Sequence, residues 1–272
     1  MRVVLFCGGQ GMRLREYSEQ IPKPMVPIGY RPILWHLMRY YAHFGHNEFI
    51  LCLGYRADAI KSYFLNYDET LSNDFVLSAG GREVQLLNRD IADWKITFVE
   101  TGSHSNIAGR LMAVREHLEG EETFLANYAD GLCDIALDCY LEAFVESQAI
   151  AKFVAVKPTT RFHIVDMQQN GAVDRVQELA NAGIWMNGGF FAFRQEIFDY
   201  IRDGEEIIAE PFQRLIKEKR LIAEKYDGFW MSMDTFKDKQ LLDDLYSRGV
   251  APWELWKREP GTLPGSAEPK ID

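Results

Sequence analysis

Glycines and a fixed cation lie close together near the start of the chain, in the stretch CGGQGMRLREYSEQIPKPM that follows a short apolar run. The glycines of this loop are Gly8, Gly9 and Gly11. Glycines directly after a buried strand let the chain turn sharply and present successive backbone amides to an anion. Lys23 stands between two prolines, which fix the local backbone and lower the entropic cost of presenting its ammonium group. The stretch therefore predicts a site for phosphate groups.

The glycine loop alone does not identify a class of protein, because dinucleotide-binding folds and P-loop NTPases also carry one. A dinucleotide-binding fingerprint would need a glycine at position 14, which is Leu14, and an acidic residue after the second strand, where the chain reads Gly54 and Tyr55. The P-loop needs Gly-Lys-Ser or Gly-Lys-Thr, and this loop has neither. Both of these classes are excluded.

Two aspartates follow strand-like segments, one in each half of the chain. Asp130 comes after TFLANY and Asp234 comes after GFWMSM. Mg²⁺ prefers one or two carboxylates together with phosphate oxygens and water. A single aspartate after a strand is more often a turn or cap residue, so a Mg²⁺ site and a cap role both stay open for these two residues at this point.

Strand-like and helix-like segments alternate in the first half and would position these residues. The expected strands are 2–7, 48–53, 95–100, 123–128 and 152–156, and the expected helices are 32–44, 57–66, 109–118 and 137–148. Near-continuous apolar strands alternating with helices favour an α/β fold, with a Rossmann-like, mixed and mostly parallel sheet flanked by helices. The ligand site of such a sheet lies at the carboxyl ends of its strands.

After residue 160 the alternation of long strands and helices gives way to shorter strand candidates. Helices are expected near 210–218 and 236–247. We expect a single domain over residues 1–258, with a first half of about 1–155 and a smaller, β-rich second half of about 156–258 packed on it. Residues 259–272 are rich in proline, glycine and charge and have no apolar period, which predicts a flexible tail.

The composition of the chain argues against nucleic acid, membranes and zinc as binding partners. The 272 residues are 47% hydrophobic and carry a formal net charge of -10, which repels nucleic acid and anionic membrane surfaces. The four cysteines form no CxxC pair and have no histidine spacing suited to zinc. The first apolar run is too short for a signal peptide and no later run reaches membrane-spanning length, so we expect a cytoplasmic protein with neither a nucleic-acid nor a membrane partner.

Several separated segments, over roughly residues 2–257, resemble the sugar-1-phosphate nucleotidyltransferase family, and within it the glucose-1-phosphate cytidylyltransferases. The segments are GGQGMRL, PKPM, TGSHSNIAGRL, YADG, MNGGFFAF and GFWMSMDTFKDK. The resemblance implies an enzyme that joins a nucleoside triphosphate to a sugar 1-phosphate, forms a nucleotide sugar and releases pyrophosphate. It implies that the half at about 1–155 binds the nucleotide and that the half at about 156–258 binds the sugar phosphate. It also implies CTP as the preferred donor, and assembly as a homo-oligomer.

The resemblance also implies roles for individual residues. Arg13 would grip the departing phosphates, and Lys23 would meet the α-phosphate, where charge builds in the transition state. Asp130 and Asp234 would hold Mg²⁺. The nucleotide-binding positions would be Gly8, Gly9, Gly11, Met12, Ser105, Arg110 and Ala129. A plain helix start is the alternative for the segment that contains Ser105 and Arg110.

On the sugar side the resemblance implies contacts from Glu178, Asn187 and Gly188. Met12 stands where the family usually has threonine, and Ala129 stands where it often has glycine. The larger departure is Leu179, at the position of the lysine that holds the sugar phosphate. A dianion in a partly desolvated cleft needs a nearby cation, so we expect Arg161 to replace that lysine, with Lys157 as the weaker candidate. We further expect a sugar other than unmodified glucose.

Two alternatives remain at this point. A metal-dependent glycosyltransferase of similar fold would use the aspartates but has no need of the glycine loop with Lys23. An inactive, sugar-nucleotide-binding homologue is favoured only by Leu179.

Overall fold

The computed structural model describes residues 1–9, 21–159 and 162–258. In this part of the chain the main sheet has eight strands, and four from the first half are parallel neighbours in the order β8, β1, β4, β7. Their bounds are β1 (Val3–Phe6), β4 (Glu48–Leu53), β7 (Lys95–Glu100) and β8 (Thr123–Tyr128). These strands fall where the sequence predicts them, and the mixed, mostly parallel sheet flanked by helices is confirmed.

The strands of the second half join the same sheet. They are β10 (Ala151–Val156), β13 (Met186–Asn187), β14 (Phe191–Arg194) and β15 (Leu221–Tyr226). Strand β14 lies between β8 and β10 and is antiparallel to both, whereas β15 runs parallel to β10 along its other edge. The stretch WMNGGFFAF therefore breaks into two short strands, and one continuous sheet crosses the boundary between the halves.

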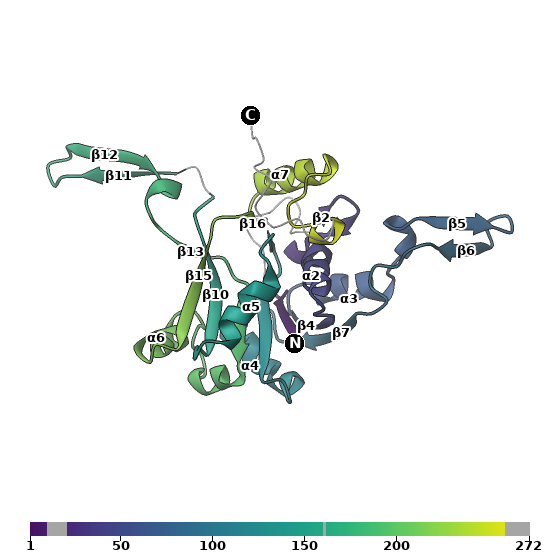
Figure 1. Cartoon of the computed structure of the whole chain (residues 1–272), viewed down its shortest axis with the longest axis horizontal. Helices are drawn as coiled ribbons and strands as arrows, with labels where there is room; N and C mark the ends of the chain where they lie inside the picture. The colour runs from purple at the N-terminus through teal and green to yellow at the C-terminus, as the bar shows by residue number, and fades with distance from the viewer. Residues whose placement is uncertain (10–20, 160–161, 259–272) are drawn as a thin grey trace.

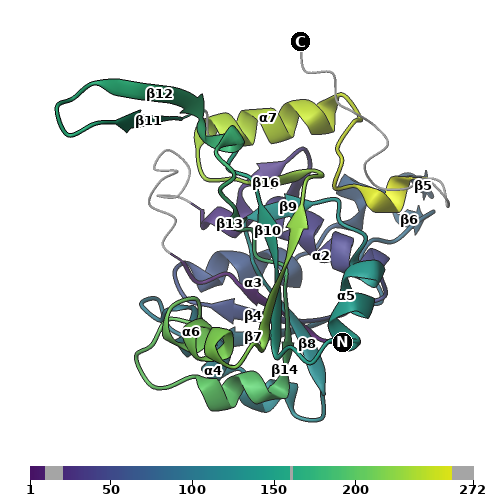
Figure 2. The same ribbon diagram turned by 60° about the vertical axis from the view of Figure 1, so that its left-hand side comes forward.

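Helices cover both faces of this sheet (Figure 2). Alternation along β1 divides the core: Val3 and Leu5 pack on one face, Val4 and Phe6 on the other. Helices α2 (Ile33–His43), α3 (Ala57–Leu65), α5 (Leu137–Val145) and α7 (Phe236–Ser247) contribute to the first core, and α4 (Ile107–Ala113) and α6 (Glu210–Lys217) contribute to the second. The site residues thus rest on strands buried from both sides.

Short elements complete the described chain. The 3₁₀ helices are η1 (Lys23–Met25), η2 (Glu69–Leu71), η3 (Arg115–Leu118), η4 (Leu179–Asn181), η5 (Gln195–Tyr200) and η6 (Leu255–Lys257). Strands β2 (Pro27–Ile28) and β3 (Arg31–Pro32) form one small hairpin. No helix within the described ranges is long and apolar enough to cross a membrane.

Two antiparallel arms project from opposite sides of the body (Figure 1). The first is β5 (Phe75–Ser78) with β6 (Glu83–Leu86), and the second is β11 (His163–Met167) with β12 (Val173–Glu178). Sequence patterns predict the second arm but not the first. Both arms expose apolar side chains, including the cross-strand pairs Leu77 with Val84 and Val165 with Val176.

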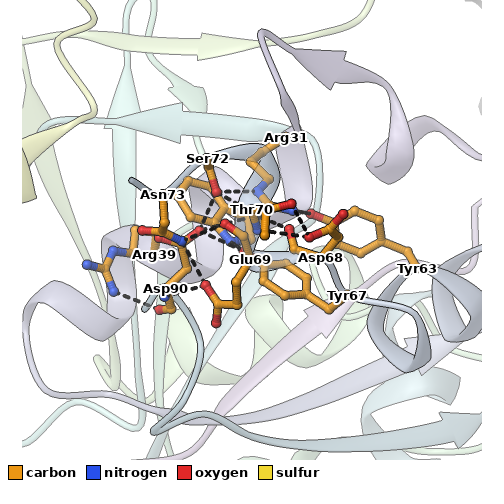
Figure 3. Close-up of polar contacts among 11 residues, drawn as sticks. Arg31, Arg39, Tyr63, Tyr67, Asp68, Glu69, Thr70, Ser72, Asn73 and Asp90 are labelled. Atoms are coloured by element: carbon orange, nitrogen blue, oxygen red, sulfur yellow. Dashed lines mark hydrogen bonds and ion pairs between the residues drawn. The ribbon is translucent and has the colours of Figure 1, made fainter. Parts of the chain in front are cut away.

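A buried cation holds the base of the first arm, as Figure 3 shows. The Arg31 side chain is only 2% exposed. Its guanidinium donates to the Ser72 hydroxyl at 2.5 Å and to the Asp68 carbonyl at 2.8 Å, and it lies 3.3 Å from an Asp90 carboxylate oxygen. Asp90 also accepts from the Tyr67 hydroxyl at 2.9 Å. Because a buried charge requires such partners, this cluster fixes both ends of the arm to Arg31 on strand β3, directly before helix α2.

Candidate active site

A short two-stranded sheet brings the predicted metal-binding aspartates together. Strand β9 (Gly131–Cys133) pairs with β16 (Trp230–Ser232), and the register places Gly131 opposite Ser232. The Met233 backbone amide then donates to the Asp130 carbonyl at 2.9 Å. This pairing sets Asp130, from the first half of the chain, beside Asp234 from the second.

Lys23 lies between these two carboxylates. Its Nζ is 2.6 Å from Oδ2 of Asp130 and 2.7 Å from Oδ1 of Asp234, and its side chain is 12% exposed. Pro22 and Pro24 flank the lysine, which opens the 3₁₀ helix η1, and the Met25 amide donates to the Pro22 carbonyl at 2.8 Å. The lysine and the two aspartates predicted separately from sequence thus form one group.

The charge balance of this group is set by the carboxylates. Burial alone would lower the pKa of Lys23, but Asp130 and Asp234 outweigh it and hold that pKa above its ordinary value. The Ser232 hydroxyl donates to the other oxygen of Asp234 at 2.7 Å, which orients that carboxylate. Lys23 is therefore charged and tightly paired at neutral pH.

The donor set fits a Mg²⁺ ion that brings its own ligands. Both carboxylate oxygens lie within 2.7 Å of one nitrogen, so a single cation can contact both, as the ammonium group does. Among the described residues no group of three or more His, Cys, Asp or Glu side chains could hold a metal. Two carboxylates alone leave Mg²⁺ dependent on phosphate oxygens and water, which is its ordinary state in phosphoryl-transfer sites.

The structure explains why position 8 is a glycine, because the side chain of Arg110 occupies the space that a Cβ would need. A Cβ built on Gly8 would lie 1.9 Å from a guanidinium nitrogen of Arg110, whereas one built on Gly9 would meet no atom of the described residues within 4 Å. Arg110 is 3% exposed, and its guanidinium donates to the Gly8 carbonyl at 2.9 Å and to the Thr101 hydroxyl at 2.8 Å. In the structure Arg110 therefore supports the loop from behind, and its predicted contact with the nucleotide stays a prediction.

The remaining nucleotide-side residues flank this loop. The Ser105 hydroxyl donates to the Thr101 carbonyl, in the turn before helix α4. Asn106 caps that helix by accepting from the Gly109 amide at 2.8 Å. Ala129 is 2% exposed and belongs to the first core, directly before Asp130. The segment is thus a helix start beside the glycine loop, and its contact with a nucleotide stays a prediction.

On the sugar side, Asn187 is oriented by its neighbours. Its amide nitrogen lies 3.3 Å from the Tyr128 hydroxyl, and its side-chain oxygen accepts from the Gly189 amide at 2.9 Å. A Cβ on Gly188 would lie 3.0 Å from a methyl group of Val156 and 3.1 Å from the Trp230 indole nitrogen. That indole donates to the Gly188 carbonyl at 2.8 Å. Side chains of the protein therefore occupy the space that a Cβ on Gly188 would need, and the predicted contact of Gly188 with the sugar stays a prediction.

The other predicted site residues are Glu178 and four residues that the structure does not describe. Glu178 is exposed at the end of β12, on the second arm, where its carboxylate accepts from the Asn181 side-chain amide at 3.4 Å. Gly11, Met12, Arg13 and Arg161 lie outside the described residues, as does the predicted tail 259–272.

Sequence patterns missed three positioning residues: Tyr128, Trp230 and Ser232. Each acts on a site residue at a distance along the chain or across a strand, through the contacts given above. Only Ser232 carries a local signal, because it stands two residues before Asp234, where strand alternation places both side chains on one side.

Comparison with known proteins agrees with this geometry. A model of the nucleotidyl transferase family matches residues 2–242. The chain belongs to this family. It is 37% identical over 258 residues to the probable glucose-1-phosphate cytidylyltransferase of Bacillus subtilis (strain 168), covering 94% of this chain and 100% of that protein. It is 36% identical over 259 residues to the glucose-1-phosphate cytidylyltransferase of Salmonella typhi, with the same coverage of 94% and 100%.

Solved structures of nucleotidyl transferases share the fold. A putative glucose-1-phosphate thymidylyltransferase from Bacillus anthracis superposes with a TM-score of 0.66 at 16% identity, over 92% of this chain and 95% of that one. A UDP-glucose pyrophosphorylase superposes with a TM-score of 0.65 at 16% identity, over 91% and 98%. The predicted family and enzyme class are confirmed: this nucleotidyl transferase forms a nucleotide sugar from a nucleoside triphosphate and a sugar 1-phosphate.

Proposed function

We propose that this nucleotidyl transferase uses CTP and a hexose 1-phosphate, with Mg²⁺, to form a CDP-hexose and pyrophosphate. The observation that carries the catalytic part is Lys23 lying 2.6 and 2.7 Å from two carboxylates at one end of the sheet. The base and the sugar class come from the names of the relatives in Bacillus subtilis and Salmonella typhi.

The chemistry needs charge neutralisation more than proton transfer. An oxygen of the sugar phosphate bonds to the α-phosphorus, and the bond from that phosphorus to the oxygen bridging to the β-phosphate breaks, so pyrophosphate leaves. The attacking oxygen is already ionised near neutral pH because the second pKa of a phosphate is about 6, so no general base is required. When bound, Mg²⁺ supplies positive charge to the phosphates and the departing pyrophosphate.

Residues of the chain would position the two substrates and neutralise the negative charge of their phosphates. Lys23 would place its ammonium group at the α-phosphate, where negative charge increases in the transition state. The backbone amides of Gly8 and Gly9 would donate hydrogen bonds to phosphate oxygens. The Arg110 guanidinium donates to the Gly8 carbonyl and so supports this loop. Asn187, oriented by Tyr128, would meet a sugar hydroxyl.

The test is a matrix of the four nucleoside triphosphates, each labelled at the α-phosphate, against several hexose 1-phosphates. We expect label to appear in a CDP-hexose, with equimolar pyrophosphate. Label in a nucleotide sugar with another base would reject CTP as the donor. An absence of labelled nucleotide sugar and of pyrophosphate in every reaction would reject the proposed nucleotidyl transfer.

We also propose that the protein assembles as a homo-oligomer through its two arms. An isolated two-stranded ribbon is marginally stable, and each arm presents an exposed apolar cross-strand pair. Leu77 and Val84 are 58% and 52% exposed, and a second copy of the chain would cover them. Location in the cytoplasm stays a prediction.

Light scattering on the purified protein tests this assembly. Leu77→Lys combined with Val84→Lys should lower the molar mass toward that of one chain, because each buried charge would oppose the interface. Leu65→Lys is the matched control, since Leu65 is 81% exposed on helix α3 and lies outside the arms. A wild-type mass of one chain, or an arm variant of unchanged mass, would reject the proposal.

A further inference from the structure

Lys23 and a metal ion would compete for the same carboxylate oxygens of Asp130 and Asp234. The ammonium group contacts one oxygen of each carboxylate, at 2.6 and 2.7 Å, and the lysine side chain is 12% exposed. A divalent cation bound by the same oxygens would have to occupy nearly the same position. Two cations cannot share it, because their repulsion in a poorly solvated site is large.

We propose that Lys23 is an internal competitor of the metal ion: it occupies the Asp130 and Asp234 carboxylates until a triphosphate offers its ammonium group another anionic partner. The proposal rests on the proposed function, since it assumes that a metal and a triphosphate meet at this group. It concerns what the lysine does before any reaction begins.

The cost of displacing Lys23 explains why the nucleotide should matter. A metal ion arriving alone must break two charge-assisted hydrogen bonds and leave a partly buried ammonium group without a partner. A metal ion that binds together with a triphosphate breaks the same hydrogen bonds. The phosphate oxygens then accept new hydrogen bonds from the Lys23 ammonium group. Metal and triphosphate should therefore bind cooperatively, and Lys23 should carry that coupling.

The geometry also limits how Lys23 moves. Its backbone is fixed by the flanking prolines, and the Val26 amide donates to the Lys23 carbonyl at 3.1 Å. Only the flexible side chain needs to turn for the ammonium group to leave the carboxylates. The exchange is thus a change of rotamer on a fixed support rather than a rearrangement of the fold.

The test measures binding of Mn²⁺ alone, by the loss of the free-ion electron paramagnetic resonance signal, to protein without nucleotide. Lys23→Met, which keeps the length of the side chain and removes its charge, should bind Mn²⁺ about tenfold or more tightly than wild type. Lys95→Met is the matched control. It makes the same change of net charge at the start of β7, where Lys95 pairs with Glu48 at 3.2 Å, and it should leave Mn²⁺ affinity unchanged.

Two further measurements complete the design. Adding Asp130→Asn to Lys23→Met should abolish the gain, which locates the ion at the carboxylates. In wild type, cytidine 5′-(α,β-methylene)triphosphate should tighten Mn²⁺ binding much more than it does in Lys23→Met. If Lys23→Met misfolds by circular dichroism, Lys23→Gln replaces it.

The proposal is overturned if neutral residues at position 23 leave Mn²⁺ affinity unchanged or weaken it. It is also overturned if the gain survives Asp130→Asn. Failure of the proposed function is a different result, because it shows as an absence of nucleotide sugar in the substrate matrix, whereas Mn²⁺ competition is measured without turnover.

Discussion

At the scale of single residues, Lys23 is expected to have opposite effects on metal binding and on catalysis. Lys23→Met should lower kcat on the order of 10²-fold or more, about 3 kcal/mol, because its charge is matched to the transition state. The KM for CTP should change far less. Steady-state kinetics at saturating Mg²⁺ check this, and a kcat within a factor of about three of wild type would reject the assigned role.

Leu179 stands where the family resemblance implies a lysine that holds the sugar phosphate. Its backbone amide donates to the Phe162 carbonyl at 2.8 Å, so position 179 is tied to the segment that directly follows Arg161 in sequence. We predict that Arg161→Ala raises the KM for the sugar phosphate with little change for CTP, because the dianion loses its cation.

The companion change is Leu179→Lys, which should shift preference toward glucose 1-phosphate. Competition between glucose 1-phosphate and other hexose 1-phosphates measures that shift. If Arg161→Ala leaves sugar-phosphate saturation unchanged and wild type already prefers glucose 1-phosphate, position 179 carries no information about the substrate.

At the scale of elements, the loop after β1 offers a matched pair of glycines. Gly8→Ala should destabilise the fold by about 1–3 kcal/mol, because its Cβ would meet the Arg110 guanidinium at 1.9 Å and force a shift. Gly9→Ala should leave the free energy of unfolding unchanged, since no atom in the part of the chain that the structure describes lies within 4 Å of its Cβ. Urea unfolding of both variants checks the prediction, and equal losses would contradict it.

The same loop shows how far sequence patterns reach. Apolar runs and the residues after them predict the parallel strands and the placement of Asp130 and Asp234, since strand ends are local properties. The reason for Gly8 is not local: Arg110 lies 102 positions further along the chain. The first arm was missed because both of its faces are exposed, so FVLSAGGREVQL shows no clean alternation between apolar and polar residues.

At the scale of the whole molecule, a buried histidine joins the two ends of the described chain. His36 on α2 is 1% exposed. Its Nε2 lies 3.0 Å from the Ile28 carbonyl, and its Nδ1 lies 3.3 Å from the Trp253 indole nitrogen. A neutral ring with its proton on Nε2 satisfies both contacts, whereas a second proton would face the indole N–H. Burial lowers the pKa of His36 from 6.5 to about 4, and the charges of Lys257 and Arg31 act in the same direction.

This histidine predicts a loss of stability in acid. Between pH 6.5 and about 4 the unfolded chain takes up a proton that the folded chain refuses, so the free energy of unfolding falls as pH falls. The full contribution is about 3 kcal/mol. It is present above pH 6.5 and is lost by about pH 4.

Unfolding measured at several pH values in this window, for wild type and His36→Gln, isolates the effect from that of carboxylates. The variant keeps a neutral donor for the Ile28 carbonyl, so its stability should fall less steeply with acid. A His36 resonance that titrates at or above pH 6.5 in the folded protein would contradict this account.

The order of strands in the sheet has a consequence for the chain during its synthesis. Strand β14 is made after β10 but lies between β8 and β10, so β10 cannot take its final place until β14 emerges. At roughly 5–20 residues per second, the edge of β8 stays open for several seconds while the intervening residues are made. An unpaired strand edge is a template for pairing with another chain. Nascent copies on neighbouring ribosomes are therefore exposed to mispairing at β8, and slowing translation just before β14 should increase aggregation.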